Sequence, residues 1–297
     1  MNILEQIIEY KRSEVRRRKS EASISKLETT SYFNRTSLSL KESLQKGDRS
    51  GIIAEFKRRS PSKGIINAKA SVIEVTTAYT ENGASGLSVL TDENFFGGKN
   101  EDLIKARINE VPILRKDFVI DEYQIIEAKS IGADVILLIA ACLTPAEVER
   151  LSKFAKNLGL EVLLELYDER ELGHICDQTQ LVGINNRNLK TFEVNIEQSL
   201  KMAERIPADK IKIAESGIHS VDDVMVFREN GFKGFLIGEL FMKKSDPAIA
   251  FAEFVNALRM MPPKAESNQQ FKQFLGGDKN ASEGMWGHHA VAIGGDG

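Results

Sequence analysis

The chain alternates short apolar runs with longer amphipathic stretches. Eight of the runs are rich in Val, Ile and Leu and have the length of strands buried on both faces. They span residues 51–56, 86–90, 111–114, 134–140, 160–166, 181–184, 211–214 and 234–237. The stretches between them are predicted to be helices, so the pattern indicates a repeating strand–helix protein.

The clearest predicted helix begins at Thr144. This residue can cap the helix, Glu147 completes a capping box, and Gly159 ends an apolar stripe at helical spacing. Ser220 and Asp246 mark the starts of two further helices. Helix starts placed between the apolar runs support the alternation of strands and helices.

Eight strands that alternate with helices imply a parallel sheet with right-handed crossovers. Eight units favour closure into a barrel, although periodicity alone leaves a doubly wound sheet open. We therefore predict an α/β protein of the (β/α)8, or TIM-barrel, class with an extra N-terminal helical segment. The predicted division is a helical extension over 1–48, the barrel over 49–261 and a flexible tail over 262–297.

The N-terminal extension is predicted to hold an amphipathic helix, from Ile3, Leu4, Ile7, Ile8 and Val15. Such a helix could close the bottom of the barrel. It could also lie over the opposite end, where barrel enzymes have their active sites. The pattern of apolar residues does not choose between these two positions.

Composition excludes several functional classes. The chain has 40 basic and 43 acidic residues, a net charge of −3, so it lacks the basic field that gathers nucleic acid. No apolar run approaches the roughly 18–20 residues that span a bilayer, and the first residues do not form a signal peptide. Neither Cys142 nor Cys176 nor the four histidines have metal-ligand spacing. We expect a cytoplasmic protein without a metal, membrane or nucleic-acid partner.

Polar residues end several of the predicted strands, where barrel enzymes carry their chemistry. Glu55 and Lys57 share a face after the first run, either as a rim ion pair or as ligands for a substrate. Lys116 ends the third run, where a dry environment could lower its pKa for proton transfer, unless it reaches solvent. Glu165 ends the fifth, and burial should raise its pKa for acid–base work.

The later strand ends add donors and an anion site. Asn185 and Arg187 share a face and suit a carboxylate, although they would also pass as a polar loop. Glu215 ends the seventh run, and Gly217 and Gly238 follow strands seven and eight, where this fold usually binds phosphate. The set fits a phosphorylated substrate with a second anionic group and at least one proton transfer.

These residues lie in segments that resemble the signatures of the indole-3-glycerol-phosphate synthase family. The segments are residues 55–64, 89–98, 114–118, 164–165, 183–189 and 214–218. They occur in the family's order within a similarity that runs from about residue 3 to residue 260, and the first and third are highly specific in combination. The tail after residue 264 has no counterpart in the family.

The resemblance implies a carboxy-lyase of tryptophan biosynthesis. The implied substrate is 1-(2-carboxyphenylamino)-1-deoxyribulose 5-phosphate, and the products are indole-3-glycerol phosphate, carbon dioxide and water. It implies no metal or organic cofactor, and it favours a position of the N-terminal helix over the active site. A monomer or weak homodimer is expected, with possible contact to other enzymes of the tryptophan pathway.

The resemblance also implies a role for each site residue. Lys116 is the expected general acid for the ribulose carbonyl oxygen, and Glu165 assists proton transfer near the anilino nitrogen. Lys57, paired with Glu55, helps to hold the substrate carboxylate and takes part in the dehydration. The other expected substrate ligands are Asn185, Arg187, Glu215, Ser216, Phe118 and Pro61. Phosphate is expected at Ser60, Gly217, Gly238 and Glu239, the last through its backbone N–H, with its side chain turned away.

Two rival interpretations follow from the same pattern. Another phosphate-binding barrel, such as phosphoribosylanthranilate isomerase or the tryptophan synthase α subunit, would share the glycines of the cradle. It would have no reason to carry the signatures around Lys57 and Lys116 together. A catalytically dead barrel kept as a binding module would be supported by loss of Lys116 or Glu165, and both are present.

Overall fold

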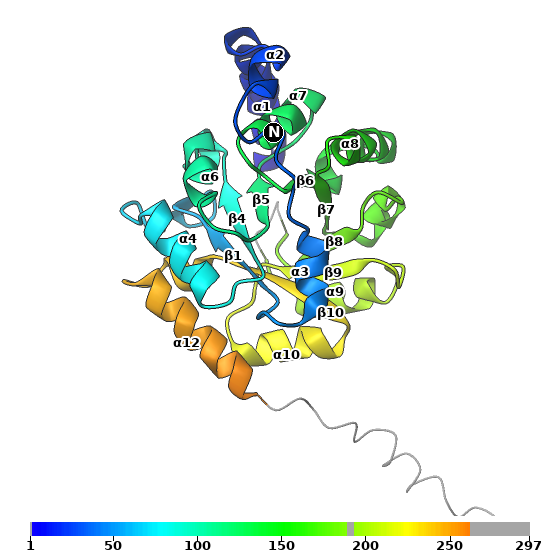
Figure 1. Cartoon of the computed structure of the whole chain (residues 1–297). Helices are drawn as coiled ribbons and strands as arrows, with labels where there is room; N and C mark the ends of the chain where they lie inside the picture. The colour runs from blue at the N-terminus through cyan, green and yellow to red at the C-terminus, as the bar shows by residue number, and fades with distance from the viewer. Residues whose placement is uncertain (1, 189–192, 262–297) are drawn as a thin grey trace, which may run out of the picture. The chain divides into compact units, whose positions relative to one another are not determined.

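The computed structural model describes residues 2–188 and 193–261, in which eight parallel strands close into a barrel (Figure 1). Around the barrel the order is β1-β10-β9-β8-β7-β6-β5-β4, and β4 pairs with β1. The strands are β1 (Ile52–Phe56), β4 (Gly86–Leu90), β5 (Ile113–Lys116), β6 (Val135–Ile139), β7 (Glu161–Leu166), β8 (Leu181–Asn185), β9 (Ile211–Glu215) and β10 (Phe232–Ile237). The predicted barrel is confirmed. The predicted tail over 262–297 lies outside the described residues, as does Leu189, the last residue of the segment 183–189 that resembles the family.

Helices follow most of the barrel strands. The helices are α1 (Ile3–Glu21), α2 (Ile24–Glu28), α3 (Leu40–Lys46), α4 (Val72–Glu81), α5 (Glu93–Phe96), α6 (Asn100–Ala106), α7 (Glu122–Ser130), α8 (Pro145–Asn157), α9 (Ile196–Ala203), α10 (Val221–Glu229), α11 (Glu239–Met242) and α12 (Pro247–Met260). The capping box predicted at Thr144 is present, and the helix predicted to begin after Ser220 also begins with one. A short 3-10 helix, η1 (Ala140–Cys142), follows β6.

The segment between β7 and β8 does not form the predicted α-helix. It holds the 3-10 helix η2 (Glu169–His174) instead. Leu172 and Ile175 are its apolar side chains packed against the core, and they cover a single turn. One turn of apolar contact stabilises a short 3-10 segment but not a longer α-helix.

A small antiparallel hairpin follows β1 and was not predicted. It pairs β2 (Arg59–Ser60) with β3 (Gly64–Ile65). Gly64 has a φ of 66°, the left-handed conformation that glycine adopts without strain. Strands of two residues are too short to show a period-two pattern, so the hairpin could not be predicted from the apolar pattern.

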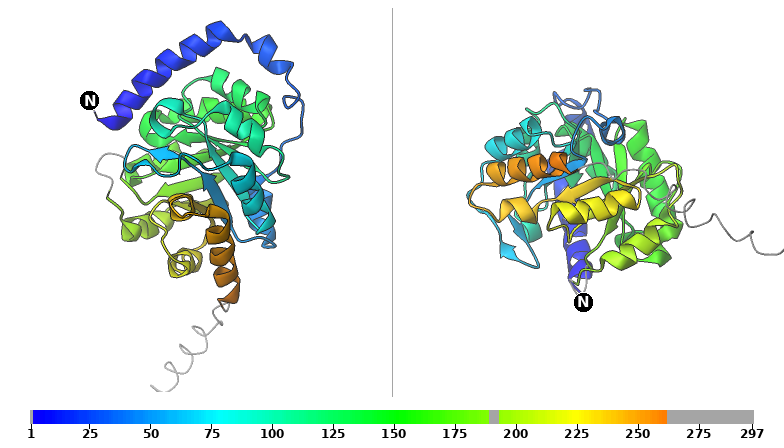
Figure 2. Two further views of the ribbon diagram at one scale, coloured as in Figure 1. Left: turned by 90° about the vertical axis from the view of Figure 1, so that its left-hand side faces the viewer. Right: turned by 90° about the horizontal axis from the view of Figure 1, so that it is seen from below.

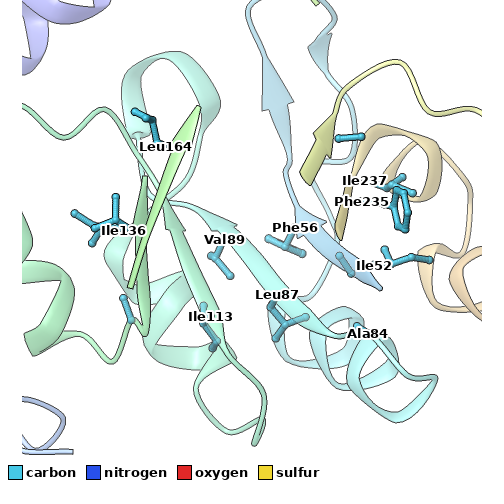
Figure 3. Close-up of a cluster of buried hydrophobic side chains, with 14 of the residues drawn as sticks. Ile52, Phe56, Ala84, Leu87, Val89, Ile113, Ile136, Leu164, Phe235 and Ile237 are labelled. Carbon is cyan, nitrogen blue, oxygen red and sulfur yellow. The ribbon is translucent and has the colours of Figure 1, made fainter. Parts of the chain in front are cut away.

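Alternation along the barrel strands separates two apolar layers. One layer points outward against the helices, and Figure 3 shows part of it, including Ile52, Leu87 and Ile113. The other points inward, and Ile53 and Leu163 belong to it. Each fully buried side chain of this size stabilises the fold by roughly 1.5–3 kcal/mol, so the two layers together make closure favourable.

The N-terminal segment reaches both ends of the barrel. Ile3, Leu4 and Ile7 of α1 line a cavity at the end where the strands finish. Leu40 and Leu44 of α3 join the inward-facing layer at the end where the strands begin. Figure 2 shows α1 and α3 on different sides of the barrel, joined by the segment that holds α2. Both positions left open by the sequence are therefore occupied, each by a different helix.

Candidate active site

The polar strand ends converge on one cavity of about 140 Å³. Because strand side chains alternate, the residues that continue the inward-facing layer at each strand's end point into the barrel mouth. Eleven predicted site residues line this cavity: Glu55, Lys57, Ser60, Pro61, Lys116, Phe118, Glu165, Asn185, Arg187, Glu215 and Ser216. The structure thus brings together side chains from β1, β5, β7, β8 and β9 and the loops that follow them.

Lys116 lies at the centre of this constellation. Its Nζ is 2.6 Å from Oε2 of Glu215 and 3.0 Å from Oε2 of Glu165. Burial opposes the charge on Lys116, but the carboxylates of Glu165, Glu215 and Glu55 outweigh it and raise the pKa above its usual value. The expected lowering of the Lys116 pKa is therefore wrong. The sequence could not reveal its carboxylate partners, because Glu165 and Glu215 end strands that are far from Lys116 in the chain.

The two carboxyl groups that hold Lys116 differ in protonation. Burial, reinforced by the nearby charge of Glu165, raises the pKa of Glu215 to about 8 although Lys116 opposes this. Glu165 is also buried, but Lys116 and a 3.0 Å hydrogen bond from Asn185 Nδ2 lower its pKa. The raised pKa expected of Glu165 is therefore wrong, and Glu215 is the residue whose pKa is raised. Near pH 7 the two carboxyl groups together hold one proton beside the charged Lys116.

A glycine makes room for the Glu215 carboxyl. A Cβ added at Gly183 of β8 would lie 2.1 Å from Oε1 of Glu215, so a side chain there would displace the carboxyl. Oε1 itself is buried and has no hydrogen-bond partner among the described residues. A buried polar atom without a partner is unfavourable, so this oxygen is suited to meet a polar group of a ligand.

Glu55 and Lys57 form the predicted ion pair, with 2.7 Å between Lys57 Nζ and Glu55 Oε1. Burial opposes ionisation of Glu55, but Lys57 and Lys116 lower its pKa, so the carboxylate is charged. Ser88 Oγ donates a further hydrogen bond of 3.3 Å to it. The pair lines both this cavity and a smaller one beside it. It is therefore an ion pair in contact with two binding spaces.

The smaller cavity has a volume of about 50 Å³ and holds the glycines predicted for phosphate. Gly217 and Gly238 line it, and a Cβ at Gly238 would lie only 2.7 Å from Cβ of Glu55. Ser216 has a φ of 65° and Gly217 one of 69°, a pair of left-handed residues that turns the backbone around the cavity. Ser60 lines the larger cavity and does not belong to the lining of this one.

Cations surround the smaller cavity. Lys57 and Arg187 line it together with Lys243, which the sequence analysis missed. Lys243 stands four residues after Glu239, one helical turn along, and that spacing was the available signal. Glu239 also lines the cavity, and its carboxylate lies 3.5 Å from Arg187 Nη2. The side chain thus faces a cation of the cavity, in contrast to the expectation that it turns away.

Known proteins resemble the chain over most of its length. A family model described as indole-3-glycerol phosphate synthase matches residues 4–254. A protein of that name from Bacteroides thetaiotaomicron is 47% identical over 259 residues, covering 87% of this chain and 99% of the relative. Another from a Polaromonas species is 41% identical over 257 residues, covering 85% and 97%. The chain belongs to the indole-3-glycerol phosphate synthase family.

This membership settles the class of reaction. Indole-3-glycerol phosphate synthases are carboxy-lyases of tryptophan biosynthesis, and the chain is an enzyme of this type that acts on a small phosphorylated substrate. Solved structures agree on the fold. A tryptophan synthase alpha subunit from Legionella pneumophila has a TM-score of 0.55 at 13% identity, covering 74% of this chain and 96% of that chain. At that identity the likeness shows the barrel alone.

A buried lysine attaches the N-terminal helix α1 to the residues that follow β4 and β5. Lys11 Nζ of α1 lies 2.8 Å from Asp92 Oδ2, 2.9 Å from Asp117 Oδ1 and 2.6 Å from Glu14 Oε2. Asp117 directly follows Lys116, and Asp92 caps α5. The sequence did not predict this cluster, because no local pattern connects its members and Lys11 and Asp117 are 106 residues apart.

Within residues 2–188 and 193–261, no group of three or more His, Cys, Asp or Glu side chains is placed to hold a metal ion. Among the helices of that part of the chain, none is long and apolar enough to cross a membrane.

Proposed function

We propose that this enzyme closes the indole ring of 1-(2-carboxyphenylamino)-1-deoxyribulose 5-phosphate, with Lys116 as the general acid. The observation that carries the proposal is the position of Lys116 Nζ between Glu165 and Glu215, in a cavity that adjoins a smaller one with glycines and cations. A charged donor between two acidic groups suits a reaction in which protons move several times within one site.

The two cavities suggest how the substrate binds. The phosphate fits the smaller cavity, where Gly217 and Gly238 allow the backbone to approach an anion and Lys57, Arg187 and Lys243 supply positive charge. The aromatic ring fits the larger cavity, which has apolar walls from α1, Pro61 and Phe118. Lys57 and Arg187 line both spaces, so they are suited to the substrate carboxylate.

Ring closure joins the aromatic carbon that bears the carboxylate to the ribulose carbonyl carbon. As that bond forms, the carbonyl electron pair moves to oxygen, and Lys116 donates the proton that makes it a hydroxyl. Positive charge develops at the anilino nitrogen, which the ionised Glu165 stabilises. Glu215, with a pKa raised to about 8, can return a proton to Lys116 across 2.6 Å. Holding the two carbons together can contribute several kcal/mol to catalysis.

The remaining steps release carbon dioxide and water. The bond to the carboxylate carbon breaks, and its electrons neutralise the positive charge at nitrogen. Lys57 then protonates the hydroxyl, which leaves as water with the electrons of its C–O bond. The neighbouring ring carbon, which is bonded to nitrogen, loses a proton to the ionised Glu165, and the new double bond completes the indole. Glu55 holds the Lys57 ammonium in position for this step through their 2.7 Å ion pair.

The assignment is tested by product fluorescence and released carbon dioxide after addition of the substrate to the purified enzyme. We expect equal amounts of both products, and no activity with phosphoribosylanthranilate or indole-3-glycerol phosphate as the starting compound. Turnover of either alternative substrate in place of the expected one would contradict the proposal and favour another phosphate-binding barrel.

We further propose that the enzyme acts in the cytoplasm as a monomer or weak homodimer. All fourteen residues assigned to the site come from one chain, so a second copy is not needed to complete it. Both cysteines are free, as is usual where thiols are kept reduced. Light scattering across a range of concentrations measures the oligomeric state. Co-purification with tagged enzymes of tryptophan biosynthesis tests for pathway partners.

A further inference from the structure

The smaller cavity carries a negative charge of its own. The two carboxylate oxygens of Glu239 reach different cations, with Oε2 3.5 Å from Arg187 Nη2 and Oε1 3.8 Å from Lys63 Nζ. Glu239 begins α11 directly after Gly238 and lines the same cavity. A carboxylate is an unusual lining for a space that is suited to phosphate, because like charges repel across a few ångströms.

We propose that the Glu239 carboxylate competes with the substrate phosphate for Arg187, which lines the smaller cavity. In this arrangement the carboxylate neutralises Arg187 and Lys63, and an incoming phosphate with a charge of about −1.5 to −2 displaces it from Arg187. The inference rests on the proposed function, because it takes the smaller cavity as the phosphate site. It assigns to the side chain a role separate from that of the Glu239 backbone N–H.

The contacts of Glu239 are suited to exchange. Its two pairs are longer than the 2.7 Å pair of Lys57 with Glu55 and the 2.6 Å pair of Lys116 with Glu215. The Glu239 side chain is 24% exposed and that of Lys63 is 54% exposed. Partly exposed ion pairs at these distances are weak, so a stronger anion can replace one of the partners. The Gly238 backbone stays in place, because it is packed against Glu55.

The consequence is discrimination between anions. The whole substrate makes further contacts in the larger cavity, and these can offset the cost of displacing Glu239. Inorganic phosphate makes only the contacts of the smaller cavity, so the carboxylate weakens its binding most. Repulsion of a competitor is a common means of specificity. Glu239 is therefore a specificity-determining residue that does not touch the reacting atoms.

The test is the inhibition constant of inorganic phosphate, measured in competition with the substrate. For Glu239→Gln we expect that constant to fall about threefold to tenfold, and KM to fall with little rise in kcat. Glu239→Ala should change it in the same direction, which separates loss of charge from gain of an amide. The effect should shrink at high salt, because it is electrostatic.

Glu93→Gln is the matched control. Glu93 also pairs with one lysine, Lys99, at 3.7 Å on an exposed surface, but it lines neither cavity. Its inhibition constant should equal that of the unaltered enzyme. Inhibition that is equal or weaker in Glu239→Gln would overturn the inference and leave the phosphate site intact. Absence of competitive inhibition in every form would overturn the phosphate site itself, and the inference with it.

Discussion

Glu165 and Glu215 are the same type of residue at the ends of β7 and β9, and both contact Lys116. They differ in their other neighbours, because Asn185 donates to Glu165 whereas Oε1 of Glu215 has no partner among the described residues. Burial is common to both, so this difference decides which carboxyl holds the proton. Lys116, Glu165 and Glu215 were all predicted from the sequence. Their relative pKa values were not, because these depend on contacts between strands that are distant in the chain.

The proton on Glu215 predicts a pH dependence. Its pKa is raised to about 8, so Glu215 is mostly protonated at pH 7 and loses its proton as the pH rises through 8. If that proton restores Lys116, kcat should fall over the same range. In Glu215→Gln the fall near pH 8 should disappear, and kcat at pH 7 should drop about tenfold to a hundredfold. A profile of kcat from pH 6 to pH 10 decides this, and an unchanged fall in the variant would assign it to another group.

At the scale of elements, the sequence predicted what is regular and missed what is short or determined by distant contacts. The eight strands were found because each is buried on both faces and therefore continuously apolar. The β2–β3 hairpin and η2 were missed because neither is long enough to show a period. The apolar pattern left the position of α1 open, because its apolar face would suit either end of the barrel, whereas the family resemblance favoured the mouth, where α1 lies. Lys11 supplies the missing information, since it has buried acidic partners only at the mouth.

Lys11→Met tests how α1 is held. The substitution removes a buried cation and leaves Asp92 and Asp117 without it, so we expect a loss of about 3–5 kcal/mol in the free energy of unfolding. Lys19→Met is the matched control, because Lys19 also joins α1 to the barrel at Asp121 but is 46% exposed. It should cost less than about 1 kcal/mol. Urea denaturation measures both, and equal losses would show that Lys11 has no special part in attaching α1.

At the scale of the whole molecule, the two ends of the barrel have different tasks. The end where the strands begin is closed by Leu40 and Leu44 of α3, whereas the end where they finish carries the charged residues of the cavity. Glycines and polar groups could be assigned to the mouth from the sequence because this fold places its chemistry there. The packing of α3 could not be predicted, because an apolar pattern does not show which surface a helix covers.

Leu44→Ala should therefore separate stability from activity. It removes a buried side chain from the closed end, and we expect a loss of about 2–5 kcal/mol in the free energy of unfolding. Turnover per folded molecule should not change, because Leu44 lies away from the cavity of the mouth. Ile249→Ala on α12 is the control, since Ile249 is 56% exposed and should have little effect on stability. A selective loss of kcat in Leu44→Ala would show that the two ends are coupled.

The central claim is that Lys116 supplies the proton for ring closure. The most direct test compares Lys116→Ala with the unaltered enzyme in substrate binding and in product fluorescence. We predict that the variant still binds the substrate, because Lys116 neither lines the smaller cavity nor makes the contact between Glu55 and Lys57. Product formation should fall by at least about a hundredfold. Retained binding with unchanged turnover would contradict the claim and transfer the general-acid role to another group.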